Sequence, residues 1–199
     1  MAEEEKLIRD AKNGDREAFG LLYDRYAPRI YRFIFLKTGH KSDAEDLLHE
    51  VFIAAWKGMS RYEAGAFPVT SWLYQIARNR VIDHYRAAKG GVSLDELLEN
   101  NALPIELAST SSGVLLEALN RKLELHEAMQ AVRALPEEQQ TVVIMRFVED
   151  LSPEEVGQAI GKSAGAVRLI QHRAIKKLKT MIETEHHEHA AETRTHGTA

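Results

Sequence analysis

Four acidic side chains crowd one stretch of the sequence, where they could form a surface for a basic partner. Asp43, Asp46 and Glu50 are three and four residues apart, so they share one face of a helix, and Glu45 lies beside them. A second stripe with helical spacing is apolar and predicts the buried side: Ala44, Leu47, Leu48, Val51 and Ala55. The charges have two explanations. Acids are favoured near a helix N-terminus and are often simply solvated there, or the face docks on a basic partner.

Aromatic and polar side chains share one side of a second expected helix. Trp72, Asn79, Asp83 and Arg86 return to nearly the same angle around a helix. An indole plane beside amide, carboxylate and guanidinium groups suits stacking on exposed nucleic-acid bases and reading their edges. The alternative is that Trp72 belongs to the core and that the polar groups are solvated.

The C-terminal part has a pattern typical of DNA binding. Residues 161–182 include six basic residues and no acidic residue. A short helix expected over 153–160 is followed by a glycine-containing turn at 161–163 and a second helix, which together predict a helix-turn-helix. The apolar residues of the second helix define its packed face: Val167, Ile170, Ala174, Leu178 and Met181. A basic, outward-facing side suits a recognition helix in the major groove. The alternative is a basic surface helix that binds no DNA.

The motifs of enzymes and metal sites are incomplete in this sequence. The chain has no cysteine, which excludes a disulfide, a thiolate zinc site and a cysteine nucleophile. The turn at 161–163 has the Gly-Lys-Ser ending of a phosphate-binding loop, but Val156 stands where that loop requires glycine. His49 and Glu50 are not continued to H-E-x-x-H, because Ile53 occupies the next ligand position. We therefore expect no catalytic activity, no metal ion and no cofactor.

Helices must position these side chains, and both halves of the chain have helical periodicity. Apolar residues recur at intervals of three and four, and the two-residue alternation of strands is absent. The sequence therefore predicts an all-α fold, with the functional side chains on helices over 43–57, 70–89, 153–160 and a last helix that ends near residue 182.

Several helix ends carry local signals. Ser42 with Glu45, and Ser152 with Glu155, have the S-x-x-E spacing of a capping box. Gly58 is placed to end the first of the four helices. These signals predict where the helices begin and end.

The composition divides the chain of 199 residues into two differently built parts. Of the 14 aromatic residues, 13 precede residue 86, and glycine, asparagine, proline and serine gather between the two parts. The net charge of -4 excludes a uniformly basic protein that coats nucleic acid. We expect two small helical domains joined by a flexible linker, the C-terminal one containing the helix-turn-helix. The expected boundaries are a domain over 5–89, a linker over 90–122, a domain over 123–182 and a disordered tail over 183–199.

The sequence also bears on location. The longest apolar run, Val51 to Trp56, is six residues long, whereas a membrane-spanning helix needs about 20. The N-terminal residues lack the basic start and apolar stretch of a signal peptide. We expect a cytoplasmic protein.

Three stretches resemble segments of bacterial sigma factors, in the same order along the chain. The run DAEDLLHEVF (43–52) resembles the segment that binds core RNA polymerase, and the run SWLYQIARNR (71–80) resembles the segment that binds the −10 promoter element. The runs LPEEQQ (135–140) and RFVE (146–149), followed by the helix-turn-helix, resemble the −35-binding domain. With only these two domains and a short linker, the chain resembles the extracytoplasmic-function sigma factors over about residues 5–182.

This resemblance implies roles for three sets of residues. The set that would meet the coiled-coil clamp helices of the largest polymerase subunit is Asp43, Glu45, Asp46, Leu47 and Glu50. The set that would hold the melted −10 strand is Arg61, Tyr62, Trp72, Asn79, Asp83 and Arg86. The set that would contact the −35 duplex is Arg168, Leu169, His172, Arg173 and Lys176. The implied partners are core RNA polymerase, promoter DNA and an anti-sigma factor that restrains the protein, with no insertion into a membrane.

Two other functions account for parts of the pattern. A stand-alone helix-turn-helix regulator would bind operators as a dimer and would hold duplex DNA tightly without polymerase. A helical interaction protein would sequester a partner, which leaves the base-reading faces unexplained. A near-neutral net charge weakens non-specific attraction to phosphates, as suits a sigma factor that must not occupy DNA strongly by itself.

Overall fold

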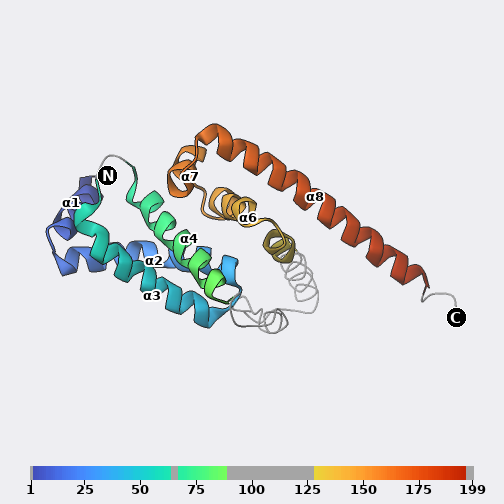
Figure 1. The fold of residues 1–199 in the computed structure, drawn as a ribbon, viewed down its shortest axis with the longest axis horizontal. Coiled ribbons are helices and arrows are strands. Elements are labelled where there is room, and N and C mark those ends of the chain that lie inside the picture. The colour runs from blue at the N-terminus through green and yellow to red at the C-terminus, as the bar shows by residue number, and fades with distance from the viewer. Residues whose placement is uncertain (1, 64–66, 89–127, 196–199) are drawn as a thin grey trace, which may run out of the picture. The chain divides into compact units, whose positions relative to one another are not determined.

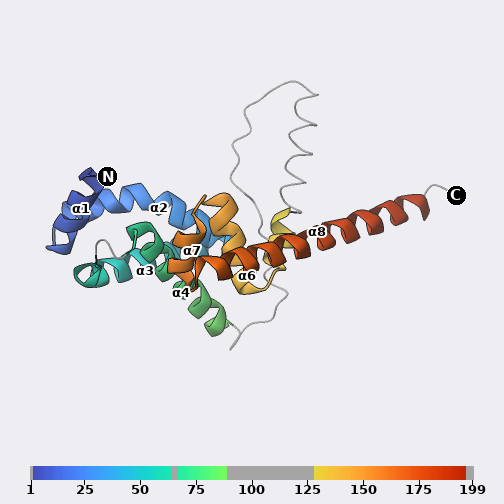
Figure 2. The same ribbon diagram turned by 90° about the horizontal axis from the view of Figure 1, so that it is seen from above.

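Every secondary-structure element that the structure describes is a helix. The structure is a computed structural model and describes residues 2–63, 67–88 and 128–195 (Figures 1 and 2). The elements are α1 (Ala2–Lys12), α2 (Arg16–Thr38), α3 (Lys41–Gly58), the 3-10 helix η1 (Met59–Arg61), α4 (Val69–Ala88), α6 (Glu137–Val143), the π-helix η3 (Ile144–Val148), α7 (Pro153–Ile160) and α8 (Ala164–Thr195). The all-α prediction is confirmed. The expected linker over 90–122 lies outside the described residues.

The chain divides into two compact units. The first unit comprises Met1–Asn101 together with Ile144–Val167, and the second comprises Ala102–Val143 and Arg168–Ala199. Within the first unit α7 packs on α4, and η3 packs on α2. The expected domain boundaries, 5–89 and 123–182, stay a prediction. Helical periodicity identifies the buried side of each helix but not the helix that covers it, so the sequence does not reveal this grouping.

The helices α2, α3 and α4 pack on one another at the centre of the first unit, and α1 packs on α2. Their inward side chains are completely buried and include Ile30, Phe33, Ile34, Val51, Ala55, Tyr74, Ala77 and Val81. Burying a large apolar side chain stabilises a fold by roughly 1.5–3 kcal/mol relative to leaving it exposed. The apolar stripe that the sequence predicted over 44–55 is confirmed as core, because all five of its residues are buried.

Both ends of α2 are determined by local interactions. The Asp15 carboxylate accepts hydrogen bonds from the backbone N–H groups of Glu17 (2.9 Å) and Ala18 (3.1 Å), which are left without helical partners at a helix start. At the other end Gly39 has a φ of 79°, and its N–H donates to the carbonyl of Phe35. Glycine reaches this left-handed conformation at little cost. The tight ending leads directly into α3.

One of the two expected capping boxes forms. The Ser152 hydroxyl accepts a hydrogen bond from the N–H of Glu155 (3.1 Å), and the Glu155 carboxylate accepts one from the N–H of Ser152 (2.7 Å). Pro153 occupies the first position of α7, where a missing N–H costs nothing. The prediction for this helix start is confirmed.

The other capping box, at Ser42 and Glu45, was wrong. The helix α3 begins at Lys41, and its N-cap is His40, which makes no side-chain capping bond. The short connection from α2 starts the helix one residue before Ser42, so Ser42 lies within the helix. Glu45 lies 3.7 Å from the Lys41 ammonium, one turn back. The end of α3 at Gly58 agrees with the prediction.

The last helix is longer than expected. We expected α8 to end near residue 182 and a disordered tail to follow, but α8 continues to Thr195. Residues 183–195 include no glycine or proline, and alanine and glutamate have high helix propensity. The low apolar content of this stretch therefore led to the wrong helix end. Within the described ranges, no helix combines the length and the apolar character that crossing a membrane requires.

Candidate functional site

The acidic face of α3 is presented to solvent, with one exception among the expected residues. Glu45, Asp46 and Glu50 are exposed, and Asp43 is half-buried. Leu47 is only 4% exposed and belongs to the core. Leu47 therefore anchors α3 in the core and is not available to a partner. The face that a partner can reach consists of carboxylates.

Two of these carboxylates contact basic side chains of the neighbouring helix α4. The Asp43 carboxylate lies 3.4 Å from Nε2 of His84, and the Glu50 carboxylate lies 3.9 Å from Nη1 of Arg80. Asp46, between them in sequence, is exposed. The structure thus places the acidic face beside basic groups of the helix expected to bind the −10 element, a link that helical spacing within α3 could not reveal.

Trp72 is held in a packed corner at the start of α4. The rings of Trp72 and Tyr62 lie 5.0 Å apart and are tilted by 34°. The Tyr62 side chain is buried and donates a hydrogen bond to the carbonyl of Phe67 (2.6 Å), and burial raises its pKa. Gly58 also lies close to the indole, because a Cβ added to it would meet Cζ2 of Trp72 at 3.2 Å. Tyr62 therefore positions the half-buried indole and does not itself offer a free ring face.

The other residues expected at the −10 element are exposed. Asn79, Asp83 and Arg86 follow one another along α4, and Arg61 ends η1. Nη1 of Arg86 lies 3.7 Å from the Asp83 carboxylate. The structure therefore leaves one polar, solvent-facing row on α4, as the spacing predicted.

The turn between α7 and α8 has the close packing of a helix-turn-helix. Gly161 has a φ of 71°, and the N–H of Lys162 donates to the carbonyl of Gly157 at 2.8 Å. A Cβ on Gly157 would lie 2.5 Å from the backbone oxygen of Lys162, so only glycine fits there. The Ser163 hydroxyl accepts a hydrogen bond from the N–H of Ala166 (3.2 Å) at the start of α8.

The first turns of α8 separate an apolar side from a polar one. Val167, Ile170 and Ala174 are buried, whereas Leu178 and Met181 are half-buried. All five residues expected at the −35 element are exposed: Arg168, Leu169, His172, Arg173 and Lys176. An exposed face with three cationic side chains can grip phosphates and donate hydrogen bonds to base edges.

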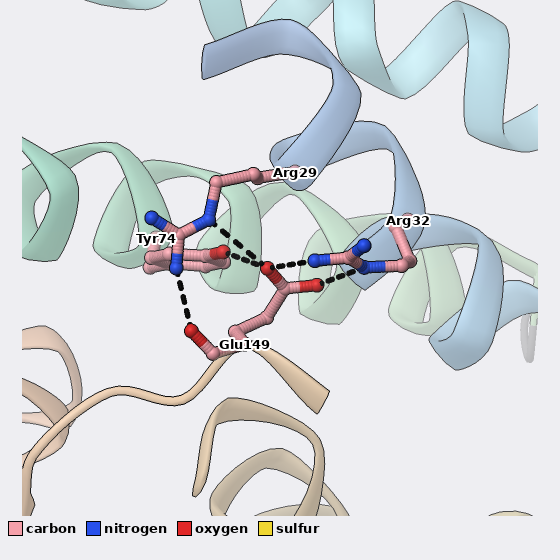
Figure 3. A network of polar contacts seen from close by, with 4 residues as sticks. All are labelled: Arg29, Arg32, Tyr74 and Glu149. Carbon is pink, nitrogen blue, oxygen red and sulfur yellow. Dashed lines mark hydrogen bonds and ion pairs between the residues drawn. The ribbon is translucent and has the colours of Figure 1, made fainter. Parts of the chain in front are cut away.

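A buried polar cluster surrounds Glu149, the last residue of the run RFVE (146–149), and nothing in the sequence indicates which side chains surround it. Figure 3 shows Arg29 and Arg32 approaching the Glu149 carboxylate from one helix, with Tyr74 reaching it from another. Arg32 donates to both carboxylate oxygens (2.6 and 2.8 Å) and Tyr74 to one of them (2.7 Å). Arg29 donates to the same oxygen as Tyr74 (3.3 Å) and to the backbone carbonyl of Glu149 (2.5 Å). The Glu149 side chain is completely buried.

The electrostatics of this cluster favour an ionised carboxylate. Burial alone would raise the pKa of Glu149, but hydrogen bonds from Arg32 and Tyr74 outweigh it, and the pKa lies below its ordinary value. Burial, reinforced by the Glu149 charge, raises the pKa of Tyr74 far above its usual range, so the phenol remains a neutral donor. The sequence offers one indication of this cluster, the spacing of Arg29 and Arg32 one helical turn apart. That spacing places the two arginines on one face but does not identify the residue that they bind.

Metal-ligating side chains do not gather in the described part of the chain: no group of three or more His, Cys, Asp or Glu residues is placed to hold an ion. The candidate site is a set of surfaces. It comprises the acidic face of α3, the Trp72 corner with the polar row of α4, and the exposed basic face of α8.

Comparisons with known proteins identify the family of the chain. The chain matches the Sigma-70 region 2 family over residues 22–90 and the Sigma-70 region 4 family over residues 131–180. It is 34% identical over 179 residues to the ECF RNA polymerase sigma factor BldN of Streptomyces coelicolor, covering 89% of this chain and 65% of BldN. It is 30% identical over 179 residues to the ECF RNA polymerase sigma factor SigW of Bacillus subtilis, covering 89% of this chain and 95% of SigW.

The fold is similar to that of a solved sigma factor. The structure of RpoE from Bartonella quintana, in complex with the anti-sigma factor NepR, aligns with a TM-score of 0.63 at 21% identity, covering 83% of this chain and 96% of RpoE. Both sigma-70 regions occur here in order, and SigW is matched along almost its whole length. The chain therefore belongs to the extracytoplasmic-function (ECF) sigma factors of RNA polymerase.

Proposed function

We propose that this protein binds core RNA polymerase and directs it to promoters through a −10 and a −35 element. The observation that carries the proposal is the exposed basic face of α8, which directly follows the capped helix α7 and the glycine turn. The family membership supplies the partner, because region 2 and region 4 are the two halves of a promoter-recognition factor. The protein acts as a binding factor and not as an enzyme.

The acidic face of α3 is the surface we assign to core polymerase. Asp46 and Glu50 are exposed, and Asp43 lies at the edge of the same face. Carboxylates on a rigid helix favour a basic partner helix and disfavour wrong partners, because like charges brought together cost several kcal/mol. Leu47 keeps this surface in place from the core.

The Trp72 corner and the polar row of α4 are assigned to the melted −10 strand. An aromatic ring that is packed from behind by Tyr62 and Gly58 loses little freedom when a base stacks on it. Stacking of this kind is worth roughly 1–3 kcal/mol per base, which helps to offset the unstacking that melting requires.

The exposed side of α8 is assigned to the −35 duplex. Arg168 and Arg173 lie near the helix start that enters the groove, and Lys176 lies farther along. Two modest DNA contacts that polymerase joins can give high specificity, because the second contact forms at a high effective concentration. A protein of net charge -4 gains little from phosphate attraction alone.

An anti-sigma factor completes the set of proposed partners. RpoE has the same fold and is held by NepR in its solved structure. A protein that diverts core polymerase must be kept inactive until it is needed, and masking its polymerase and DNA surfaces achieves this. We place the protein in the cytoplasm, where polymerase and promoter DNA are found.

Run-off transcription tests this function. Bacterial core polymerase is assayed on a promoter selected from a randomised library, with and without the protein. A transcript that needs both components supports the proposal. Tight, dimeric binding of duplex DNA without polymerase, and no transcript, would identify a stand-alone helix-turn-helix regulator instead.

A further inference from the structure

An exposed leucine stands among the polar side chains that α8 presents to solvent. The side chain of Leu169 is 50% exposed, and its neighbours His172, Arg173 and Lys176 on the helix surface are exposed as well. Single exposed leucines are common on protein surfaces, so what matters is the position of this one on the helix.

We propose that Leu169 selects thymine at one position of the −35 element, by contacting the C5-methyl group of that base in the major groove. This inference deepens the proposed function and rests on it, because it takes α8 as the helix that binds the −35 duplex. It adds the chemistry by which one base pair of that duplex is recognised.

Leu169 lies where a recognition helix meets the edges of bases. It is the sixth residue of α8, counted from Ala164, and the first turns of such a helix enter the major groove. Successive residues of an α-helix are rotated by about 100°, so Lys176 lies only about 20° around the helix from Leu169. Ile170 and Ala174 lie about 100° and 140° away and are buried. Leu169 is therefore on the side of α8 that faces away from its packing.

The side chains beside Leu169 favour DNA over an apolar protein surface as its partner. Arg173 lies about 40° to one side of Leu169, whereas His172 and Arg168 lie to the other side, and all three are exposed. Cationic and hydrogen-bonding groups on both flanks suit the two phosphate strands that border the groove. An apolar surface that covered Leu169 would have to desolvate the guanidinium groups of both arginines, which is unfavourable.

Gly165 allows this part of α8 to approach the bases closely. It lies one turn before Leu169 on the same side of the helix, and a Cβ added to it would meet only the Ser163 hydroxyl oxygen, at 4.0 Å. Packing among the described residues therefore does not require a glycine here, although glycine has a low helix propensity. Without a side chain at this point, the backbone can come nearer to the floor of the groove, which brings Leu169 within reach of a base.

Thymine is the base that suits a leucine at this position. The bases present hydrogen-bond donors and acceptors in the major groove, and thymine also presents a methyl group. The leucine side chain has no donor or acceptor, so a polar group of a base that faced it would lose its partner in water without gaining another. Leu169 therefore favours the methyl group and disfavours base pairs that place a polar group there.

Replacing thymine with deoxyuridine tests the contact, because this change removes the methyl group and leaves every hydrogen-bonding group in place. Thymines on either strand of the selected −35 element are replaced one at a time. The holoenzyme concentration that gives half-maximal run-off transcript is then measured. With the wild-type protein we expect this concentration to rise about fourfold at one position, the change expected for one buried group of the size of CH2.

Leu169→Ala should abolish this dependence on the methyl group. Holoenzyme that contains the variant should give the same midpoint with thymine and with deoxyuridine at that position. Ile175→Ala is the matched control, because Ile175 is 45% exposed on the same helix but lies about 120° around it from Leu169. The control should keep the fourfold dependence, and circular dichroism checks that both variants fold.

The outcomes separate this inference from the proposed function. No transcript from the wild-type protein would contradict the proposed function. The same deoxyuridine substitutions are then measured by fluorescence anisotropy on the duplex that the protein selects by itself, and if it selects no duplex, both proposals are overturned.

Two results with a functional wild-type protein would overturn the inference alone. The first is a dependence on the methyl group that persists in Leu169→Ala. The second is a wild-type protein that is indifferent to every thymine methyl group in the element. If Leu169→Ala then weakened transcription from all promoters alike, Leu169 would contact a protein partner instead.

Discussion

Nη1 of Arg80 on α4 lies 3.9 Å from the Glu50 carboxylate on α3. A side chain of the helix assigned to the −10 element therefore pairs with a carboxylate of the acidic face assigned to polymerase. His84 and Asp43 form a second pair between the same two helices. Ion pairs that remain accessible to water, as the Arg80–Glu50 pair does, contribute only tenths of a kcal/mol to stability. Their consequence is that Asp46, which lies between the paired acids in sequence, is the better position for testing the acidic face.

Asp46→Arg should weaken binding of core polymerase by several kcal/mol, because it places a cation against a basic partner. The free energy of unfolding should change by less than about 0.5 kcal/mol, since Asp46 is exposed. Fluorescence anisotropy with labelled protein and core polymerase measures the first quantity, and urea unfolding the second. Asp24→Arg on α2, also exposed, is the control. Equal affinity of the two variants would mean that the α3 acids are merely solvated.

Gly58→Ala should disturb the Trp72 corner. Its Cβ would lie 3.2 Å from Cζ2 of Trp72, so the indole must shift by a few tenths of an ångström. Gly20→Ala, also in a helix, has open space around the new Cβ and should stabilise the protein by roughly 0.5–1 kcal/mol. We expect Gly58→Ala to stabilise the protein by less than Gly20→Ala does, and to change the near-ultraviolet circular dichroism spectrum. An equal gain with an unchanged spectrum would show that the corner is loosely packed.

Ser152→Ala should cost about 1 kcal/mol of stability, because it removes the hydroxyl that caps α7. Ser42→Ala is a matched control, since Ser42 lies inside α3 and the N-cap there is His40. Alanine is the better helix former at such a position, so this variant should be neutral or slightly stabilising. Thermal unfolding of both variants measures the difference. A comparable loss at Ser42 would restore the capping box that the sequence predicted.

The contribution of Glu149 to stability should depend on pH. Its pKa in the folded chain lies below the ordinary value of 4.5, because Arg32, Tyr74 and Arg29 stabilise the carboxylate. The stabilisation is therefore complete above that ordinary value and is lost as the pH falls through the lower, folded value. We expect Glu149→Gln to cost about 1–3 kcal/mol at neutral pH and progressively less in acid. Urea unfolding of both chains across this range gives the difference, and a constant difference would contradict the ionised form.

Along α8, arginines and lysines should have separable effects. If Arg168 or Arg173 makes a bidentate base contact, its alanine variant should lose roughly 1–3 kcal/mol at one −35 base and relax the preference there. Lys176→Ala should weaken binding to all promoters alike and lower the salt dependence. Transcription over a randomised −35 library measures both. A change of base preference in Lys176→Ala, with only uniform weakening in the arginine variants, would reverse the assignment.

Features determined by neighbours in sequence were predictable. The apolar stripe of α3 and the Ser152–Glu155 box depend on spacings of three and four residues, and the structure confirms both. The split between buried and exposed residues at the start of α8 was predictable for the same reason. Each of these features is decided within one or two helical turns.

Features that depend on distant segments were not predictable. Glu149 and Arg32 are 117 residues apart, and nothing in the spacing around either residue names the other. The family resemblance placed Leu47 and Tyr62 among the contact residues, but both are buried. A residue can belong to a shared motif because it packs in the core, as well as because it contacts a partner.

The π-helix η3, five residues long, ends immediately before Glu149. A π-turn accommodates one more residue than an α-turn, and each residue added to or removed from an α-helix rotates the residues after it by about 100°. A deletion of a single codon between 144 and 148 would thus swing the carboxylate away from Arg32 even if every remaining amino acid were kept. Across sigma factors, the length of this segment should therefore indicate which proteins keep such a carboxylate within reach of its arginine, and alignments that place gaps freely there would miss it.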